Sequence, residues 1–316
     1  MRKLFLGIWL VLLSCGVPVK ERVERGFISL FNGKDLTGWQ VDEDSPPCFR
    51  VVDGCLVTGG GDGGLGLLCT EAEYGNYIFR FEWMLSDVGN SGILIRSDAD
   101  VNLAWNKGFE VQLLAPWTPY RDDLHCTASI YGHVAVTNRP DETTGRWHKM
   151  EIICDRKDII IAVDGELCTW ADMDRVASLN EKLLRGRIGL QCNHSGTDQW
   201  VKFRNLRIRD LDREPEYVIK GFSYTDPRIR RLTHEAAVRM NSLMVEPLCE
   251  LMTEEDSISA SGAKKALFDI AVIASAPDAS EQLRSSVAKA LDDQAGKSKS
   301  ETVRSYVVWL LGLIGG

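Results

Sequence analysis

The chain lacks a long apolar run, a basic surface and any closely spaced pair of cysteines. Its 316 residues carry 45 acidic and 37 basic side chains, which gives a net charge of −8. Lys and Arg form no stripe interleaved with aromatic residues, so nucleic acid is disfavoured as a partner. None of the nine cysteines forms a C-x-x-C pair, which disfavours a zinc ribbon. A neutral ligand such as a sugar agrees better with this composition.

Residues 1–15 have the pattern of a bacterial lipoprotein signal peptide. Arg2 and Lys3 precede an apolar run at 4–13, which is about half the length that a spanning helix needs. The run ends in Leu-Leu-Ser-Cys, which resembles the lipobox in which the cysteine, here Cys15, is acylated. We expect residues 16–25 to be a tether and the protein to be lipid-anchored in the cell envelope, in the periplasm or at the surface. The alternative is an ordinary secretory signal in which Cys15 has no role.

The other eight cysteines give no pairing from the sequence alone. An exported protein can form disulfides, but several of these cysteines lie in alternating apolar runs, where a buried thiol is the ordinary expectation. We expect at most one or two bridges.

From 26 to 212 the sequence predicts an all-β sandwich. Apolar and polar residues alternate over short runs that Gly, Asp, Asn and Pro interrupt, which is typical of strands. The clearest runs are 78–85, 109–113 and 201–208. Two Asp-Gly pairs, at 53–54 and 164–165, predict two-residue hairpin turns. With about a dozen such strands and no long helical pattern among them, two packed sheets are the economical arrangement.

After residue 212 the apolar spacing becomes that of helices. We expect a linker at 213–228 and a small α-helical domain at 229–316. The residues with helical spacing are Ala263, Ala266, Leu267, Ile270, Ile273, Ala274, Leu283, Val287, Ala290, Leu291, Val303, Val307, Leu310 and Leu311. Residues 232–251 are helical in pattern too, apart from Pro247. Helices at intervals of about 20 residues weakly resemble a HEAT-type solenoid, but a plain helical bundle has the same spacing.

A series of short motifs in the strand region resembles one bacterial family. In chain order they are LFNGKDLTGW at 30–39, GNSGILIR at 89–96, GFEVQ at 108–112, SIYG at 129–132, IGLQ at 188–191, His194, and FRNLRI at 203–208. They resemble the 3-keto-disaccharide hydrolases or lyases, a family long described as a domain of unknown function. The resemblance covers about three-fifths of the chain. It implies a jelly-roll sandwich similar to that of the concanavalin-like glucanases and cleavage of glycosides oxidised to a ketone at C3.

The chemistry that the resemblance implies is an elimination. A ketone at C3 acidifies the hydrogen at C2, so a base can remove it and the enolate can expel the group at C1. No nucleophilic carboxylate is needed, and the chain lacks the E-x-D-x-E strand of the glucanases. Two positions depart from the family: Ala115 replaces an Asp after the Glu-x-Gln strand, and Asn193 stands beside His194 where relatives often have Asp. If either Asp binds a metal or orients a catalytic group, the chemistry is altered or absent.

Strand parity and the resemblance together predict one concave polar face. Glu110 and Gln112 are two residues apart on one strand and therefore share a face; we place Arg96 beside them and His194 and Tyr131 at the edge. His194 is the candidate base for C2, Glu110 would position hydroxyls or bind a metal, and Tyr131 would protonate the leaving oxygen. The other predicted substrate contacts are Asn90, Gln191 and Trp117. The candidate ligands for a divalent metal are His125, His133 and Glu110.

Each assignment has a structural alternative. Glu110 and Arg96 could form an ion pair on the sheet, Gln112 and Gln191 could be hydrogen-bonding struts, and the loop histidines could be solvated. Three functions therefore compete: a keto-glycoside hydrolase or lyase, a non-catalytic glycan-binding module, and a surface scaffold. The first two take an oligosaccharide or glycoside as ligand, and in the third the helical domain recruits a protein partner.

Overall fold

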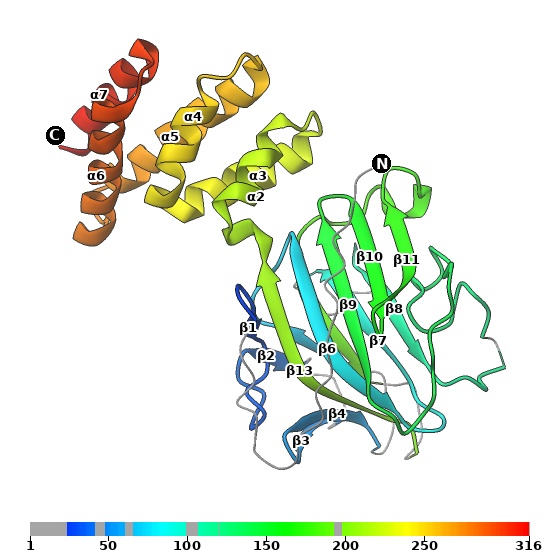
Figure 1. Cartoon of the computed structure of the whole chain (residues 1–316). Coiled ribbons are helices and arrows are strands. Elements are labelled where there is room, and N and C mark those ends of the chain that lie inside the picture. Colours follow the sequence, from blue (N-terminus) through cyan, green and yellow to red (C-terminus); the bar gives the residue numbers. More distant parts are fainter. Residues whose placement is uncertain are drawn as a thin grey trace, which may run out of the picture.

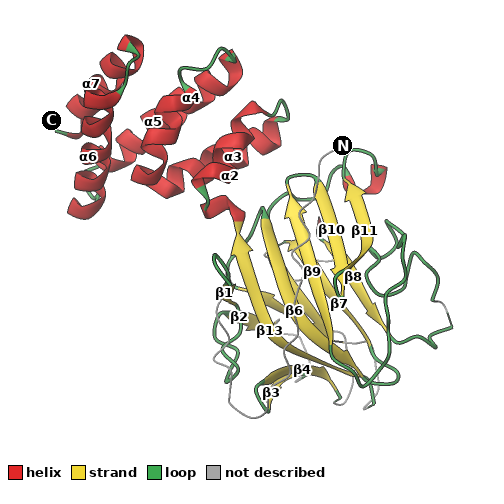
Figure 2. Cartoon of the chain, viewed as in Figure 1, coloured by secondary structure: helices red, strands yellow, loops and turns green. Residues whose placement is uncertain are grey.

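The computed structural model describes residues 24–41, 48–60, 66–98, 107–119, 121–192 and 198–315. It contains a β-sandwich followed by a helical segment, as the sequence predicts (Figures 1 and 2). The predicted signal peptide with Cys15, most of the tether, and His194 lie outside the described residues. Within the described part of the chain, no helix is long and apolar enough to cross a membrane.

The sandwich consists of two antiparallel sheets. The larger sheet contains β1 (Ile28–Ser29), β3 (Phe49–Val52), β4 (Cys55–Gly59), β6 (Tyr77–Leu85), β9 (His148–Asp155), β10 (Asp158–Val163), β11 (Glu166–Asp172) and β13 (Trp200–Asp210). Its order is β11-β10-β9-β6-β13-β4-β3, with β1 on β13. The smaller sheet contains β2 (Trp39–Val41), β5 (Gly66–Thr70), β7 (Asn90–Ser97), β8 (Phe109–Leu114) and β12 (Arg187–Cys192). Its order is β2-β5-β12-β7-β8.

The predicted alternation is confirmed along β6, where every second side chain is buried. Phe79, Phe81 and Trp83 point into the main core, where they meet Ile93 and Ile95 of the opposite sheet. Large apolar side chains buried in this way contribute about 1.5–3 kcal/mol each. The sandwich is therefore held together chiefly by the inward faces of its two sheets.

Both predicted hairpin turns are confirmed. Asp53 and Gly54 join β3 to β4 with φ of 51° and 74°, and Asp164 and Gly165 join β10 to β11 with φ of 51° and 91°. Two successive positive φ values are the geometry that Asp-Gly pairs accommodate in tight hairpins. The eight cysteines that the structure describes are free thiols, and seven of them are buried.

The helical segment begins directly after β13. Short 3-10 turns and α2 (Pro215–Val218) precede α3 (Pro227–Met240), α4 (Val245–Leu251), α5 (Ser257–Ser275), α6 (Glu281–Lys297) and α7 (Glu301–Ile314). Helix α3 packs on α5 and α5 on α7, while α4 packs on α6, so the helices form two layers (Figure 1). Pro247 is accommodated in the first turn of α4, where its missing N–H is harmless. Ile273, expected on the buried face of α5, is 43% exposed.

Residues 213–228, predicted to be a linker, are helical and packed. Val218 and Phe222 belong to the core of the helical segment. The guanidinium group of Arg156, from the sandwich, lies 4.3 Å from the ring centre of Tyr217 and 4.7 Å from that of Tyr224. Ile229 of α3 packs into the core of the sandwich. The two parts of the chain therefore share an ordered junction in place of a free connector.

Candidate functional site

The predicted polar residues meet on the outer face of the smaller sheet. Ile93 and Val111 point into the main core, so their neighbours Gly92, Glu110 and Gln112 point to the other side. The register places Gly92 opposite Gln112 on β8 and Leu94 opposite Glu110. On β12 the same parity places Gln191 on this side, because Leu190 points into the main core.

We call Asn90, Glu110, Gln112 and Gln191 the polar face. Beside it lies a small buried apolar cluster of Leu67, Cys69 and Leu94. The side chains of Gln112 and Gln191 are nearly inaccessible, at 3% and 2% exposure. Glu110 and Gln112 therefore share one side of the sheet, as predicted, and Asn90 and Gln191 lie on the same side, in surroundings that combine amide groups with apolar side chains.

Glu110 has the most perturbed environment of the four. Burial raises the pKa of its carboxyl group from 4.5 to about 8. Among the described residues its carboxyl group has no hydrogen bond and no ion pair, so nothing stabilises the charged form. The side chain lies across Gly92, where a Cβ atom would come within 1.9 Å of Glu110 Oε1. The Gly-Asn-Ser-Gly motif thus supplies the space that this carboxyl group occupies.

Two amide oxygens of the polar face are buried without a partner. In the part of the chain that the structure describes, neither Gln191 Oε1 nor Asn90 Oδ1 accepts a hydrogen bond. An unsatisfied buried acceptor costs about 1–3 kcal/mol, and a ligand that donates hydrogen bonds would recover this energy. The amide of Gln112 is engaged differently, because its Oε1 accepts from the backbone N–H of Leu113 at 2.9 Å. The two free acceptors are suited to hydroxyl donors.

The prediction that Arg96 belongs to the polar face is wrong. Its side chain is completely buried, and its guanidinium group donates to Gly75 O at 2.8 and 3.0 Å and to Arg156 O at 2.7 Å. The register between β7 and β12 shifts between Arg187 and Gly189, and Arg96 itself has φ of 49°. This irregularity ends the alternation of side chains along β7, so the position of Arg96 in the strand does not predict which way its side chain points. The proposed ion pair with Glu110 is absent as well.

The segment 126–131 continues the smaller sheet beyond β8. Gln112 N–H donates to Ser129 O at 3.1 Å, Ala128 N–H to Gln112 O at 2.9 Å, and Tyr131 N–H to Glu110 O at 2.9 Å. Tyr131 therefore lies next to Glu110 in the sheet, as predicted for the edge of the face, and it is 39% exposed. This added pairing could not be predicted from the sequence, since the segment lacks an alternating pattern.

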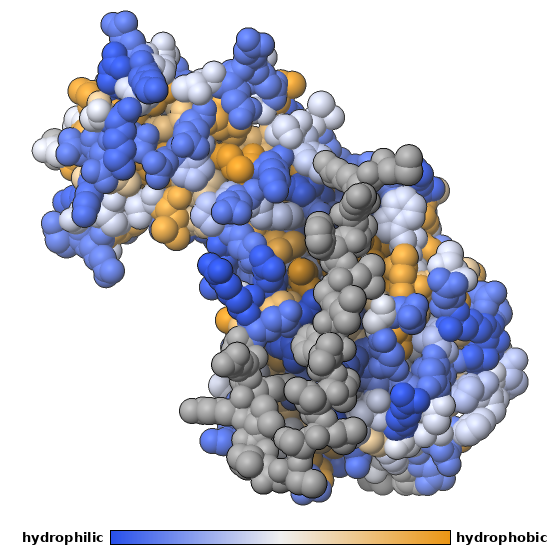
Figure 3. Space-filling model, in the orientation of Figure 1, coloured by the Kyte–Doolittle hydropathy of each residue, from blue (hydrophilic) through white to orange (hydrophobic). Residues whose placement is uncertain are grey.

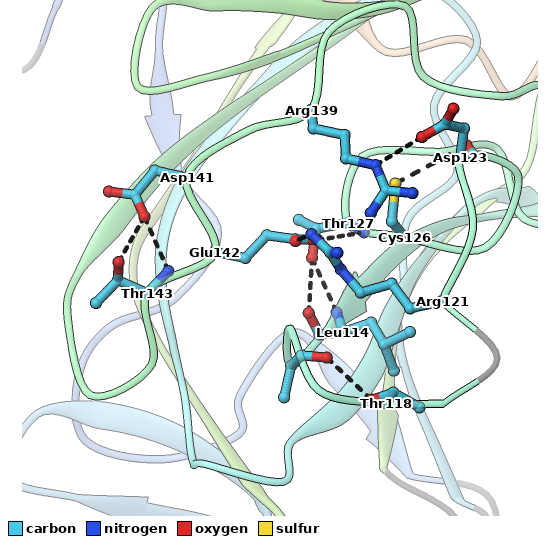
Figure 4. A network of polar contacts seen from close by, with 11 residues as sticks. Leu114, Thr118, Arg121, Asp123, Cys126, Thr127, Arg139, Asp141, Glu142 and Thr143 are labelled. Carbon is cyan, nitrogen blue, oxygen red and sulfur yellow. Dashed lines mark hydrogen bonds and ion pairs between the residues drawn. The ribbon is translucent and has the colours of Figure 1, made fainter.

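A buried carboxylate holds that segment in place (Figure 4). Glu142 accepts from Thr127 N–H at 3.0 Å and pairs with Arg121. The Thr127 hydroxyl in turn bridges the backbone of Leu114, accepting from its N–H at 3.0 Å and donating to its carbonyl at 3.1 Å. Sequence reasoning missed Glu142, because a single Glu in a polar Asp-Glu-Thr-Thr run has no periodic signal. This network fixes the strand that carries Glu110.

The candidate metal ligands are not brought together. His125 Nδ1 lies 2.7 Å from Asp122 Oδ1, and its ring packs edge-on against Tyr131 at 4.8 Å. His133 Nδ1 lies 2.8 Å from Ser178 Oγ. The pKa of His133 is lowered, chiefly by burial and to a smaller extent by the positive charge of nearby Lys182. Across the described ranges, no group of three or more His, Cys, Asp or Glu side chains could hold a metal ion. The described donors therefore do not fit a divalent metal.

Two residues that follow β8 complete the description of the site. Trp117 is 58% exposed in the turn that begins at Ala115, so it is available at the surface. Ala115 is completely buried and its N–H donates to Gly89 O at 2.8 Å. Ala115, where the resemblance leads us to expect an Asp, thus offers the site no polar side chain.

The sequence of the sandwich matches the model of a known family. The model is that of the 3-keto-alpha-glucoside-1,2-lyase-like domain, and it matches residues 26–209. The chain belongs to this family. A curated relative from Bacteroides thetaiotaomicron, named 3-keto-disaccharide hydrolase, is 28% identical over 233 residues, which cover 59% of this chain and 79% of the relative.

Solved structures agree on the fold of the family domain. Two crystal structures from Parabacteroides distasonis, both named as candidate glycosyl hydrolases, are 23% identical to the chain and cover 58% of it. Their TM-scores are 0.50 and 0.51, with 94% and 98% of the respective chains covered. At this identity the likeness concerns the fold alone, and it coincides with the predicted all-β region.

Proposed function

We propose that the sandwich cleaves the glycosidic bond of 3-keto-glycosides, with Glu110 transferring a proton. The observation that carries the proposal is the half-buried, unpartnered carboxyl group of Glu110, whose pKa of about 8 keeps it mostly protonated at neutral pH. A general acid works best when its pKa lies near the working pH. Family membership and the name of the Bacteroides relative support the substrate class.

The proposed reaction is an elimination followed by hydration. A base removes the proton from C2, the electron pair forms the C1–C2 double bond through the enolate, and the C1–O bond breaks. Glu110 gives its proton to the departing oxygen. In a hydrolase, water then adds across the double bond, which restores the sugar with its ketone. His194 is our candidate for the base, on the family motif alone.

The two unpaired amide oxygens would orient the substrate. Gln191 Oε1 and Asn90 Oδ1 can accept hydrogen bonds from sugar hydroxyls, while the adjacent apolar cluster suits the C–H face of a ring. Tyr131, beside Glu110, is placed to contact the leaving group. A site with a few placed polar groups among apolar side chains is typical of small-ligand pockets.

The test is incubation of the protein with 3-keto-glucosides and with the same glucosides unoxidised, with and without a chelator. We expect cleavage of the keto compounds only, and a loss of about 10²-fold or more in Glu110→Gln. Cleavage of the unoxidised glucosides would show that the ketone is not required. Binding without cleavage would favour the second candidate, a glycan-binding module, which the replacement of the family Asp by Ala115 supports.

We also propose two features of the rest of the chain. The layering of α3, α5 and α7 against α4 and α6 supports a HEAT-type repeat. The Leu-Leu-Ser-Cys sequence supports acylation of Cys15 and anchoring at the cell envelope.

A further inference from the structure

Helices α5 and α7 carry a row of three aromatic rings at their surface. The rings of Phe268 and Trp309 are 5.9 Å apart with an angle of 9° between their planes, and those of Trp309 and Tyr306 are 5.6 Å apart at 25°. Trp309 is 52% exposed and Phe268 is 37% exposed. In the orientation of Figure 3, apolar surface is visible among polar side chains over the helical segment. These nearly parallel rings contact one another, and Tyr306 also packs against the core of the helical segment; we call the three rings the aromatic platform.

A groove of about 530 Å³ lies beside this platform. Trp309 and Tyr306 form part of its wall. The other lining residues are three with hydroxyl groups, Ser261, Thr302 and Ser305, together with Lys264, Met252 and Ala260. Among the described residues, none of these three hydroxyls makes a hydrogen bond. The volume falls within the range of about 300–1,000 Å³ that is usual for small-ligand sites.

The charges of the groove favour a neutral ligand. No carboxylate lines it, and its single cation, Lys264, already lies 4.9 Å from the ring centre of Tyr306. A basic peptide would find no carboxylate here, and an acidic peptide would find only Lys264, whose ammonium group already lies over the ring of Tyr306. A sugar ring has an apolar C–H face that stacks on an aromatic ring and a rim of hydroxyls that can bond to the free hydroxyls of the groove.

We infer that the α5–α7 groove binds an oligosaccharide, with Trp309 as the stacking residue. The groove lies at 252–309, outside the family domain at 26–209, so the inference does not depend on the proposed reaction. A glycan held on the helical segment would remain close to the sandwich, because the ordered junction connects the two parts.

The inference is tested with the full chain by affinity gel electrophoresis in four neutral polysaccharides: dextran, barley β-glucan, galactomannan and arabinoxylan. We expect at least one of them to retard the protein and Trp309→Ala to weaken that retardation by about tenfold, which corresponds to about 1.4 kcal/mol for a lost stacking contact. Trp170→Ala is the matched control, because Trp170 is 49% exposed on β11 of the sandwich. It should migrate like the wild type.

Three results would overturn the inference: no retardation in any of the four gels, equal retardation of Trp309→Ala and the wild type, or equal loss in Trp170→Ala. Retention on poly-L-proline that depends on Trp309, without retardation by polysaccharide, would assign the groove to a peptide instead. Circular dichroism checks that the variants fold. If Trp309→Ala does not fold, Ser305→Leu replaces it, because the larger side chain fills the groove from an exposed position on α7. Ser305→Leu must then reduce the retardation by polysaccharide as strongly as expected for Trp309→Ala.

Discussion

The unpartnered carboxyl group of Glu110 should make the stability of the protein fall as the pH rises. In the unfolded chain this carboxyl group ionises near its ordinary value of 4.5, whereas in the folded protein it ionises at about 8. Between these values the folded state holds a proton that the unfolded state has lost, so the free energy of unfolding decreases with pH and levels off above 8. At about 1.4 kcal/mol per pH unit, the difference between these two pKa values lowers the free energy of unfolding by about 5 kcal/mol at most.

Glu110→Gln removes this dependence, because an amide has nearly the same shape and no charge. At pH 5 the variant and the wild type should differ by less than about 1 kcal/mol, since the pH has only just passed the unfolded-state pKa of 4.5 and the folded state is still protonated. At pH 9 the variant should be the more stable by at least about 2 kcal/mol. We expect less than the maximum of about 5 kcal/mol, because the side chain of Glu110 is partly exposed and its carboxylate can be hydrated when it ionises.

The measurement is urea unfolding of both proteins at pH 5, 7 and 9. With a slope of about 2 kcal/mol per molar urea, a difference of about 2 kcal/mol moves the midpoint by about 1 M. Glu166→Gln, on an exposed position of β11, is the matched control and should shift the midpoint equally at every pH. A Glu110→Gln curve parallel to that of the wild type from pH 5 to 9 would refute the reasoning, because the carboxyl group would then be solvated in the folded protein.

Four further outcomes follow from the structure. Gly92→Ala should reduce activity at least tenfold, because the new Cβ would come within 2.5 Å of Cγ and Cδ of Glu110 and must displace the whole side chain; an unchanged rate would contradict this. Arg96→Met should lower the free energy of unfolding by about 3 kcal/mol or more, since Gly75 O and Arg156 O lose their buried donors; a wild-type urea midpoint would count against it. The fragment 26–212 should unfold cooperatively, but about 2 kcal/mol more easily than the sandwich in the full chain, because it lacks Ile229. Cys15→Ala should release the protein from the membrane fraction or leave it unprocessed, as mass spectrometry would show.

Local pattern was sufficient for much of the fold. A strand alternates its side chains between two faces, so the sequence alone placed Phe79, Phe81 and Trp83 in the core and Glu110 with Gln112 on one face. The Asp-Gly turns were predictable for a similar reason, since two adjacent residues decide the backbone geometry. The family motifs then indicated which face of which strand carries the site.

Predictions from local spacing were wrong where tertiary contacts override the regular alternation of side chains. Arg96 leaves the polar face because the register shifts between β7 and β12, and Ile273 is exposed because the helices around α5 cover its other sides. Residues 213–228 contain few apolar residues, yet Val218, Phe222 and the two tyrosines that flank Arg156 pack them into the junction. Such contacts join residues far apart in the chain, and no local spacing encodes them.

The chemistry of Glu110 lies between these two cases. The sequence by itself determined that Glu110 and Gln112 point the same way, because side-chain direction in a strand depends only on position. Only the tertiary structure decided that the carboxyl group lies over Gly92, on the side of the sheet that carries two unpaired amide oxygens, with no cation to stabilise its charge. A pKa depends on all the groups that surround the carboxyl group in space, and those groups come from strands distant in the sequence.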